Sequence, residues 1–276
     1  MRLGYNTNGF TDHRLEDAIA ILAEIGYQSV AVTLESNLLD PPDPRGVACA
    51  VERLKPLVDR GGLGVTIETG SRFILDPRRK HQPTLLSGSE DDRRTRLEFL
   101  KAAVDVAAEV GAESVSLWSG TADDNANVGE LFARLTIGLT ELLDHAASRG
   151  VRLSFEPEPG MFIDTMAKFG QLYREMAHPQ FGLTLDVGHV YCLVDGLPDE
   201  LIQQWRNVLW NVHMEDMRRD VHEHLMFGAG EMDFAPIFQA LHEIDYPGPV
   251  HVELPRHSHN AVEVARRSFE FLRRFA

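Results

Sequence analysis

Short apolar runs alternate with longer amphipathic segments along the chain. Each apolar run is four or five residues long and has the composition of a strand that is buried on both faces. In the longer segments, apolar residues recur at the spacing of a helix that packs one side against a sheet. The expected strands cover residues 2–5, 29–33, 64–67, 114–117, 152–155, 182–185, 209–212 and 249–252.

Several of the longer segments have typical helix-boundary residues at their ends. Asp12 is a candidate N-cap for the first helix, and Gly26 ends that helix. A Pro-rich loop at 40–44 and a long loop at 70–90 separate neighbouring elements of the first half. The expected helices cover residues 15–25, 47–59, 91–110, 128–148, 165–176, 199–205, 234–244 and 261–275.

Eight strand–helix pairs in a chain of 276 residues predict a (β/α)8 TIM barrel. A doubly wound open sheet is the alternative, but it would need a phosphate-binding fingerprint or a switch point. No Gly-x-Gly-x-x-Gly follows the first strand, and no Gly/Ser linker or low-complexity run divides the chain. We therefore expect a single barrel domain that covers residues 1–276.

The last four expected strands end in residues that can bind a cation. In a barrel the carboxyl ends of the strands share one rim, so these side chains should converge. Three carboxylates at one point repel each other unless a cation neutralises them. Together with an imidazole they predict one divalent metal ion, with Mn2+ first and Mg2+, Co2+ or Zn2+ as alternatives. The four residues are Glu156, Asp186, His213 and Glu253.

Composition and charge narrow the classes of partner. A net charge of -15 argues against binding along a nucleic acid, whose phosphates need Lys and Arg. No apolar run reaches the roughly 20 residues that span a bilayer, and the first residues lack the apolar core of a signal peptide. Cys49 and Cys192 cannot build a disulfide framework. We expect a cytoplasmic protein that binds neither nucleic acid nor membrane.

Several motifs of the second half occur together in one known superfamily. They are Phe155-Glu156 with Gly160 following, Leu185-Asp186-Val187-Gly188-His189, Val212-His213-Met214-Glu215-Asp216, Gly228-Ala229-Gly230-Glu231-Met232-Asp233-Phe234, Tyr246-Pro247-Gly248 and Val252-Glu253. On these motifs the chain resembles the xylose isomerase-like TIM-barrel superfamily. That superfamily includes sugar-phosphate isomerases and epimerases, ketose 3-epimerases, inosose dehydratases and endonuclease IV. The first half fits it only in its strand–helix alternation.

The resemblance implies a role for each strand-end residue. Glu156 and Glu253 match the pair that ligates the metal and moves protons in the epimerases. Asp186 and His213 match pure ligands. The implied activity is a metal-dependent isomerase or epimerase of a sugar, keto-sugar or cyclitol. One carboxylate would remove a proton and another return it, through a metal-bound enediolate that the cation stabilises.

Further residues near the strand ends are candidates for substrate contact. His189 matches a substrate-contacting position of the superfamily, and Arg219 is a candidate for an arginine that holds substrate oxygens. His222-Glu223-His224 leaves a second metal open, although hydrogen bonding in a loop over the substrate is the favoured interpretation. The basic residues of 72–81 favour a solvated loop or subunit contact over a lid. The remaining candidates are Trp118, as an apolar wall for a sugar face, Glu158, Arg256 and His257.

Other functions stay open on the sequence. An inosose dehydratase-like lyase would use the same metal site, and a non-catalytic polyol-binding protein would keep the pocket. A metal-dependent phosphodiesterase is disfavoured, because Glu68-Thr69 and Trp118 stand where endonuclease IV has zinc-binding histidines. Relatives are often dimers or tetramers, so the resemblance implies a homo-oligomer.

Overall fold

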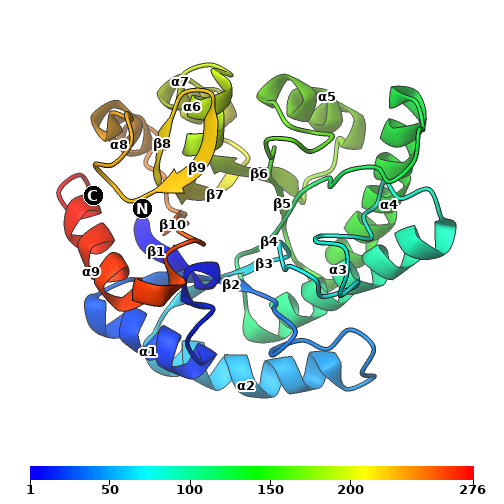
Figure 1. The fold of residues 1–276 in the computed structure, drawn as a ribbon, viewed down its shortest axis with the longest axis horizontal. Helices are drawn as coiled ribbons and strands as arrows, with labels where there is room; N and C mark the ends of the chain where they lie inside the picture. Colours follow the sequence, from blue (N-terminus) through cyan, green and yellow to red (C-terminus); the bar gives the residue numbers. More distant parts are fainter. The chain divides into compact units, whose positions relative to one another are not determined.

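Eight parallel strands form a closed barrel in the computed structural model, which describes residues Met1–Ala276 (Figure 1). Their order around the barrel is β1-β10-β7-β6-β5-β4-β3-β2. Each lies within two residues of its expected bounds, and the predicted (β/α)8 TIM-barrel fold is confirmed. The strands are β1 (Arg2–Asn6), β2 (Ser29–Thr33), β3 (Gly64–Glu68), β4 (Ser114–Leu117), β5 (Leu153–Phe155), β6 (Phe181–Asp186), β7 (Leu209–Met214) and β10 (Pro249–Val252).

The helices follow the strands in chain order, as the apolar spacing predicts. None of them is long and apolar enough to span a membrane. The α-helices are α1 (Leu15–Ile25), α2 (Gly46–Gly61), α3 (Glu90–Val110), α4 (Val128–Arg149), α5 (Met166–Met176), α6 (Val187–Leu193), α7 (Pro198–Trp205), α8 (Phe234–Glu243) and α9 (Ala261–Leu272), and the short 3-10 helices are η1 (Thr7–Phe10) and η2 (Ser258–Asn260).

Local sequence fixes several helix ends. Asn127 and Glu130 form a capping box at the start of α4, in which each side chain accepts a backbone N–H of the other residue. Gly26 ends α1 in a left-handed conformation, with a φ of 112°. The expected N-cap of α1 is wrong. Asp12 lies in a turn before the helix, and Arg14 holds the N-cap position without a side-chain capping bond.

Two elements in the second half differ from the expected pattern. Helix α6 directly continues β6, because the Asp186 side chain caps it. An antiparallel hairpin, formed by β8 (Asp216–Arg218) and β9 (Val221–Leu225), occupies the start of the loop expected after β7. Both elements are short, and neither shows the periodicity that predicts a regular element. Both carry candidate site residues.

The chain divides into two compact units. The first comprises Met1–Val32, Pro56–Thr66 and Leu183–Ala276. Within it β10 pairs in parallel with β1 and β7, and β6 pairs with β7. The register places His213 opposite Asp186 on one side and opposite His251 on the other. The first unit therefore aligns the carboxyl ends of β6, β7 and β10.

The second unit comprises Thr33–Lys55 and Ile67–Gly182. An aromatic cluster forms part of its core. The ring centroids of Phe155, Phe169 and Phe181 are 5.8 to 6.3 Å apart, and all three side chains are wholly buried. Burial of such rings removes a large apolar area from water, and the contacts between the rings stabilise the fold further.

Replacing Phe169 by Ala should lower the free energy of unfolding by about 3–5 kcal/mol, because it leaves a cavity inside this cluster. Urea denaturation followed by circular dichroism measures the change. Ile137→Ala is the matched control, because Ile137 on α4 is 70% exposed. The control should change stability by no more than about 0.5 kcal/mol. Equal effects of the two substitutions would contradict the assigned core.

Candidate metal centre and active site

Three of the four predicted metal ligands converge within the first unit. Asp186 is the last residue of β6, His213 is the penultimate residue of β7, and Glu253 directly follows β10. One ligand atom of each lies within 4.8 Å of the others. The fourth predicted ligand, Glu156, directly follows β5 and is a buried residue of the second unit. The first unit alone brings two carboxylates and one imidazole to one point.

Both carboxylate oxygens of Glu253 have close partners. Glu253 Oε2 lies 2.8 Å from His213 Nδ1, and Oε1 accepts a hydrogen bond of 2.7 Å from the Asn8 side chain. Burial raises the pKa of Glu253, but the neighbouring histidines, with His213 first among them, together outweigh burial and lower that pKa well below its usual range. Glu253 is therefore an ionised carboxylate. Asn8 follows β1 in the polar stretch 6–9, and sequence reasoning assigned it no role.

One carboxylate oxygen of Asp186 accepts a hydrogen bond, and the other does not. Its Oδ1 accepts the backbone N–H of His189 at 2.8 Å, which caps α6. Its Oδ2 is buried without a hydrogen-bond partner, and His189 Nε2 lies 3.5 Å away. Burial raises the pKa of Asp186, but the surrounding histidines reverse this and lower it. An ionised oxygen in such a place favours a cation beside it.

Glu215 adds a third carboxyl group that sequence reasoning missed. Its side chain is wholly buried, and as a carboxylate neither of its oxygens has a hydrogen-bond donor. Burial and the charge of Asp186 raise the pKa of Glu215 well above its usual range. One ligand atom each of Glu215, Asp186 and His224 lie within 4.8 Å of one another. These neighbouring carboxyl groups therefore share either a proton or a cation.

Gly188 makes room for Glu215. A Cβ at this position would overlap Glu215 Oε1 and lie 2.7 Å from the Met217 side chain. Gly188 belongs to the Leu185–His189 motif, and Glu215 belongs to the motif that ends β7. The close packing of the two explains why a glycine follows the strand-end acid. The sequence signal for Glu215 was its place two residues after a metal-ligand candidate.

Asp216 organises the loop that follows the hairpin. Its carboxylate accepts backbone N–H bonds from Gly228 at 2.8 Å, from Gly230 at 2.9 Å and from Met232 at 3.1 Å. It also accepts the N–H of Met217 at 2.9 Å. A side chain at Gly230 would overlap the Asp216 carboxylate. Asp216 is thus a structural anchor, and the Gly-Ala-Gly sequence supplies the backbone that surrounds it.

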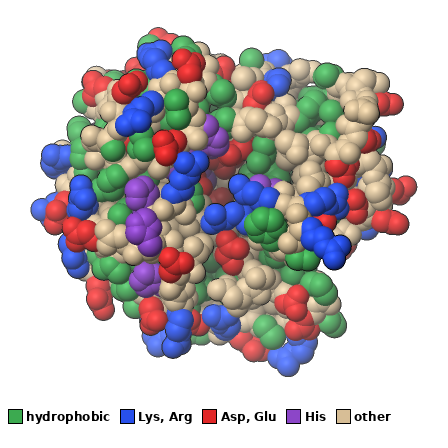
Figure 2. All heavy atoms as spheres, viewed as in Figure 1, with side chains coloured by type: hydrophobic (Ala, Val, Ile, Leu, Met, Phe, Trp, Pro, Cys, Tyr) green, Lys and Arg blue, Asp and Glu red, His purple; other side chains and the backbone are tan.

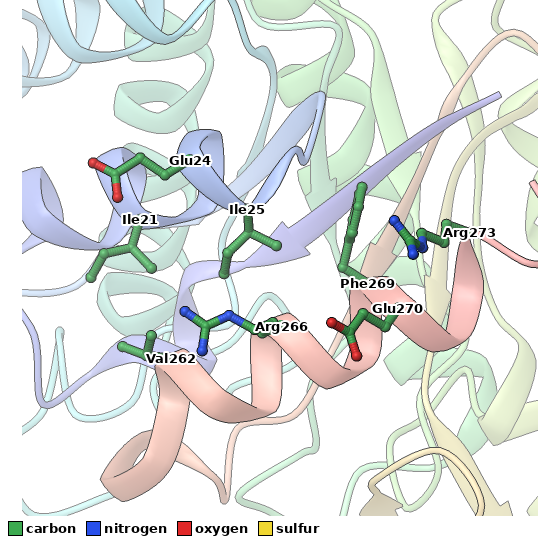
Figure 3. Close-up of a pocket in the computed structure, with 8 residues that line it drawn as sticks. All are labelled: Ile21, Glu24, Ile25, Val262, Arg266, Phe269, Glu270 and Arg273. Carbon is green, nitrogen blue, oxygen red and sulfur yellow. The ribbon is translucent and has the colours of Figure 1, made fainter.

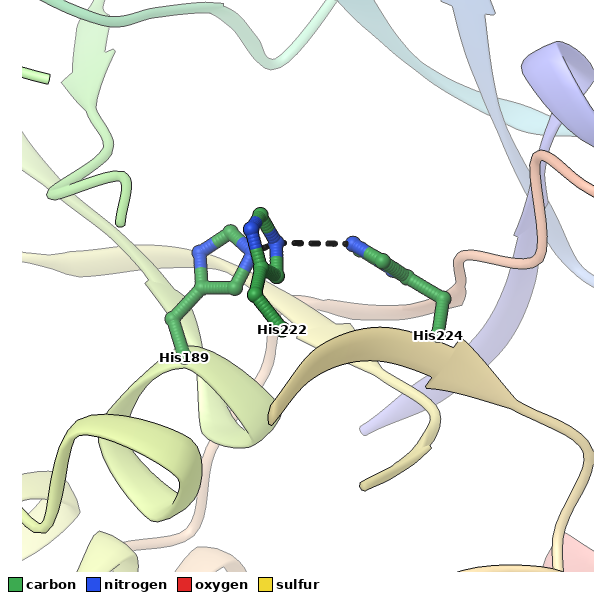
Figure 4. A group of neighbouring side chains, drawn as sticks. All are labelled: His189, His222 and His224. Atoms are coloured by element: carbon green, nitrogen blue, oxygen red, sulfur yellow. Dashed lines mark hydrogen bonds between the residues drawn. The ribbon is translucent and has the colours of Figure 1, made fainter. Parts of the chain in front are cut away.

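Three histidine side chains point toward one another (Figure 4). One of them, His224, has a ligand atom within 4.8 Å of those of Asp186 and Glu215. His222 Nε2 lies 3.0 Å from His189 Nε2 and 3.3 Å from His224 Nε2. A ring nitrogen has one in-plane site, so His222 Nε2 can satisfy only one of these neighbours by a hydrogen bond. Burial lowers the pKa of His189 to about 4. His224 Nδ1 lies 3.1 Å from the Glu253 carbonyl oxygen. The three rings form a second group that could hold an ion.

Two of the other predicted substrate residues of the first unit, Arg219 and Arg256, lie at the hairpin. The Arg219 guanidinium lies 5.1 Å from the centre of the Tyr191 ring. Arg256 pairs with Glu223 of β9 at 3.1 Å, and His257 stacks on a neighbouring histidine ring. The contacts described for Arg219 and Arg256 are thus with residues other than the three converging ligands.

Predicted residues of the second unit have partners of their own. Trp118 is buried, and the guanidinium of Arg96 lies 4.5 Å from its ring centre. Burial lowers the pKa of Arg96 to about 9. Glu158 is half-buried in the loop after β5. In the basic stretch 72–81, Arg79 pairs with Asp76 at 2.6 Å and with two further aspartates.

A separate pocket lies between α1 and α9 (Figure 3). Its volume is about 380 Å³, and acids and arginines line it together with apolar side chains. None of the predicted site residues lines this pocket. Acidic and basic side chains are also interspersed over the face shown in Figure 2. The pocket is lined by Ile21, Glu24, Ile25, Val262, Arg266, Phe269, Glu270 and Arg273.

The fold and the strand-end residues agree with a family assignment. The family model described as xylose isomerase-like TIM barrel matches residues 19–275. The chain therefore belongs to the xylose isomerase-like TIM-barrel family, and the resemblance seen in its motifs is confirmed.

The relatives of the chain include sugar epimerases. An uncharacterised protein, MJ1311 of Methanocaldococcus jannaschii, is 24% identical over 92% of this chain and 83% of its own length. The L-ribulose-5-phosphate 3-epimerase UlaE of Salmonella paratyphi A is 28% identical over 60% of this chain, and the match spans 59% of that enzyme.

Solved structures of sugar epimerases share the fold. D-allulose 3-epimerase from Methylomonas sp. has a TM-score of 0.78 at 20% identity, covering 100% of this chain and 98% of that one. The 3-keto-D-glucoside 4-epimerase YcjR from E. coli has a TM-score of 0.79 at 18% identity, covering 99% of each chain.

Gly188→Ala should destabilise the protein by roughly 1–3 kcal/mol, because the added methyl group overpacks against Glu215. Helix propensity alone would favour alanine by about 0.5–1 kcal/mol. Thermal and urea unfolding measure the change. Adding Glu215→Ala should recover part of the loss.

Gly129→Ala on α4 is the control for Gly188→Ala. The nearest neighbouring atom to its added Cβ is Asn127 Oδ1, 3.3 Å away, so no atom overlaps the new methyl group. This control should leave stability unchanged or slightly raised. A Gly188→Ala protein as stable as the wild type would contradict the packing described here.

Proposed function

We propose that the protein is a divalent-metal-dependent isomerase or epimerase of a sugar, keto-sugar or cyclitol. The observation that carries this proposal is the convergence of Asp186, His213 and Glu253, with one Asp186 oxygen buried and without a donor. Enzyme relatives of the chain are sugar epimerases, which supports the same class of reaction.

Glu156 is the proposed fourth ligand. It directly follows β5, which neighbours β6 in the strand order, and it is buried. In this fold active sites form at the carboxyl ends of the strands. Three carboxylates and an imidazole suit Mn2+ first, and Mg2+, Co2+ or Zn2+ as alternatives. The fit rests on the ligand set and on the Asp186 oxygen that lacks a donor.

When bound, the cation supplies positive charge that stabilises the negative oxygen formed as a C–H bond next to a carbonyl breaks. The residues of the chain then move the proton. Asn8 and His213 hold the Glu253 carboxylate in place, and its proposed role is to accept a proton from the substrate carbon. Glu156 returns a proton to the opposite face or to the adjacent carbon.

The substrate class follows from the same chemistry. It needs a carbonyl beside a carbon that carries both hydrogen and hydroxyl, as keto-sugars and inososes do. His189 and His224 lie beside the ligands and are proposed to contact substrate oxygens. The other proposed contacts are Arg219, Arg256, His257, Glu158 and Trp118. UlaE, by its name, acts on a ketose phosphate, and this supports a ketose for the present chain.

Glu253→Gln and Glu156→Gln should each lower turnover by about 100-fold or more, because each removes a proton-transfer group without changing its shape. Keto-sugars, their phosphates and inososes are incubated with Mn2+ in deuterated water, and deuterium at the carbon is measured by mass spectrometry and NMR. Removal of the metal by a chelator should abolish exchange, and Mn2+ should restore it.

Glu109→Gln is the control for these variants, since Glu109 is exposed on α3 and pairs with Arg149. Full activity in both active-site variants would refute the two-base mechanism. A product lighter by one water would instead identify a dehydratase that uses the same centre.

A further inference from the structure

A chain of hydrogen bonds runs from His213 into the interior of the first unit. His213 Nε2 lies 3.1 Å from the side-chain nitrogen of Asn211, whose side-chain oxygen lies 2.8 Å from His251 Nδ1. His251 Nε2 lies 2.9 Å from Ser29 Oγ, and Ser29 Oγ lies 3.1 Å from the carbonyl oxygen of Gly64. All four side chains are at most 1% exposed, so bulk water does not compete for their protons.

His251 is the centre of this chain. Gly4 of β1 pairs with His251 of β10, and a side chain at Gly4 would overlap the imidazole ring. The two ring nitrogens contact Asn211 and Ser29. A neutral imidazole has one N–H and one lone pair. His251 therefore donates to one of these neighbours and accepts from the other.

Asn211 couples the position of the ring proton in His251 to that in His213. Its amide nitrogen faces His213 and its oxygen faces His251. In this arrangement His213 Nε2 accepts, and the His213 proton lies on Nδ1, which donates to Glu253 Oε2 at 2.8 Å. His251 carries its proton on Nδ1. The Ser29 hydroxyl, which can also donate to the Gly64 carbonyl oxygen at 3.1 Å, has one proton and in this direction donates it to His251 Nε2. In this direction each group donates a hydrogen bond to the next, from Ser29 to Glu253.

We propose that this chain of hydrogen bonds reverses its donor-to-acceptor direction when His213 gives its Nδ1 lone pair to a cation. This inference rests on the metal centre proposed above. The His213 proton must then lie on Nε2, where it needs an acceptor. A half-turn of the Asn211 amide brings its oxygen to that proton and its nitrogen to His251 Nδ1. His251 then carries its proton on Nε2 and donates to Ser29.

Ser29 stands at the end of this chain of hydrogen bonds and can serve His251 either as a donor or as an acceptor. A hydroxyl donates one proton and accepts through two lone pairs. After reversal Ser29 accepts from His251 and donates to the Gly64 carbonyl oxygen, which can only accept. Each ring gives its Nδ1 proton to water and takes one from water at Nε2 during local opening of the site. Each ring therefore holds one proton in both directions, and reversal brings no charge into the interior. Ser29, His251 and Asn211 are thus positioning residues for the ligand His213.

Nitrogen-15 NMR of the histidine rings tests the proposal, because it distinguishes protonated from unprotonated ring nitrogens. In the metal-free protein we expect the proton on Nδ1 in both His213 and His251. Saturation with Zn2+, a diamagnetic probe, should move the proton to Nε2 in both rings. The response of His251 is decisive, because this ring is not among the proposed ligands.

Asn211→Asp separates transmission from structural support. Two carboxylate oxygens of similar shape accept from both rings, so the His251 proton should stay on Nδ1 with or without Zn2+. The His213 proton should lie on Nε2 even before Zn2+ is added. Asn260→Asp, at an exposed position, should show the wild-type response.

Ser29→Ala removes the acceptor that the reversed chain requires. A buried N–H without an acceptor is costly, so Zn2+ affinity should fall by about 10-fold, as for other groups that orient a metal ligand. Equilibrium dialysis measures the affinity. Ser29→Thr should restore the affinity. Ser154→Ala is the matched control, since Ser154 is also a wholly buried serine but lies on β5, outside this chain of hydrogen bonds, and it should leave the affinity unchanged.

The results separate this inference from the metal centre itself. A His251 proton that stays on Nδ1 in the Zn2+-bound wild type would overturn the reversal and leave the metal centre standing. A metal-free His213 with its proton on Nε2, or protonated on both nitrogens, would also overturn it. A protein that binds no Zn2+ through His213 would overturn both proposals.

Discussion

Three carboxyl groups of the first unit, those of Asp186, Glu215 and Glu253, lie where water scarcely reaches them. The donors near them are few: Asn8 and His213 beside Glu253, and the backbone N–H that caps α6 beside Asp186. Burying negative charge without a donor or cation is costly. A proton shared between neighbouring carboxyl groups, or a bound cation, has to offset that cost. The chemistry proposed for the protein depends on this constraint.

The surrounding backbone is shaped to keep these groups in place. Gly188 leaves space for the Glu215 carboxyl, and Gly4 leaves space for the His251 ring. Asp216, which directly follows Glu215, is turned away from this chemistry and accepts backbone N–H groups of the next loop. The neighbouring acids Glu215 and Asp216 thus have different roles, because one is buried without donors and the other accepts several backbone N–H groups.

Much of the fold could be read from the sequence. Apolar runs predicted all eight barrel strands, because strands buried on both faces must be apolar throughout. Strand ends pointed to Asp186, His213 and Glu253, which the structure brings together. Parallel strands carry their carboxyl ends to the same side, and this makes the prediction possible.

The remaining parts depend on contacts between distant segments. Asn8 carries no local signal, and Glu215 has only its place two residues after His213. The roles of both come from the residues that face them in the folded chain. The N-cap assigned to Asp12 was wrong, because the turn before α1 continues to Arg14. The hairpin of β8 and β9 is too short for periodicity to show it. His222 and His224 could therefore not be placed beside His189 from the sequence.

The loop after the hairpin is attached through its main chain to one carboxylate, that of Asp216. Backbone amides are the same whatever side chains the loop carries. Residues such as Ala229 and Glu231 can therefore change without altering the path of the loop. Evolution or an engineer could vary the chemistry presented along this segment while its course stays fixed.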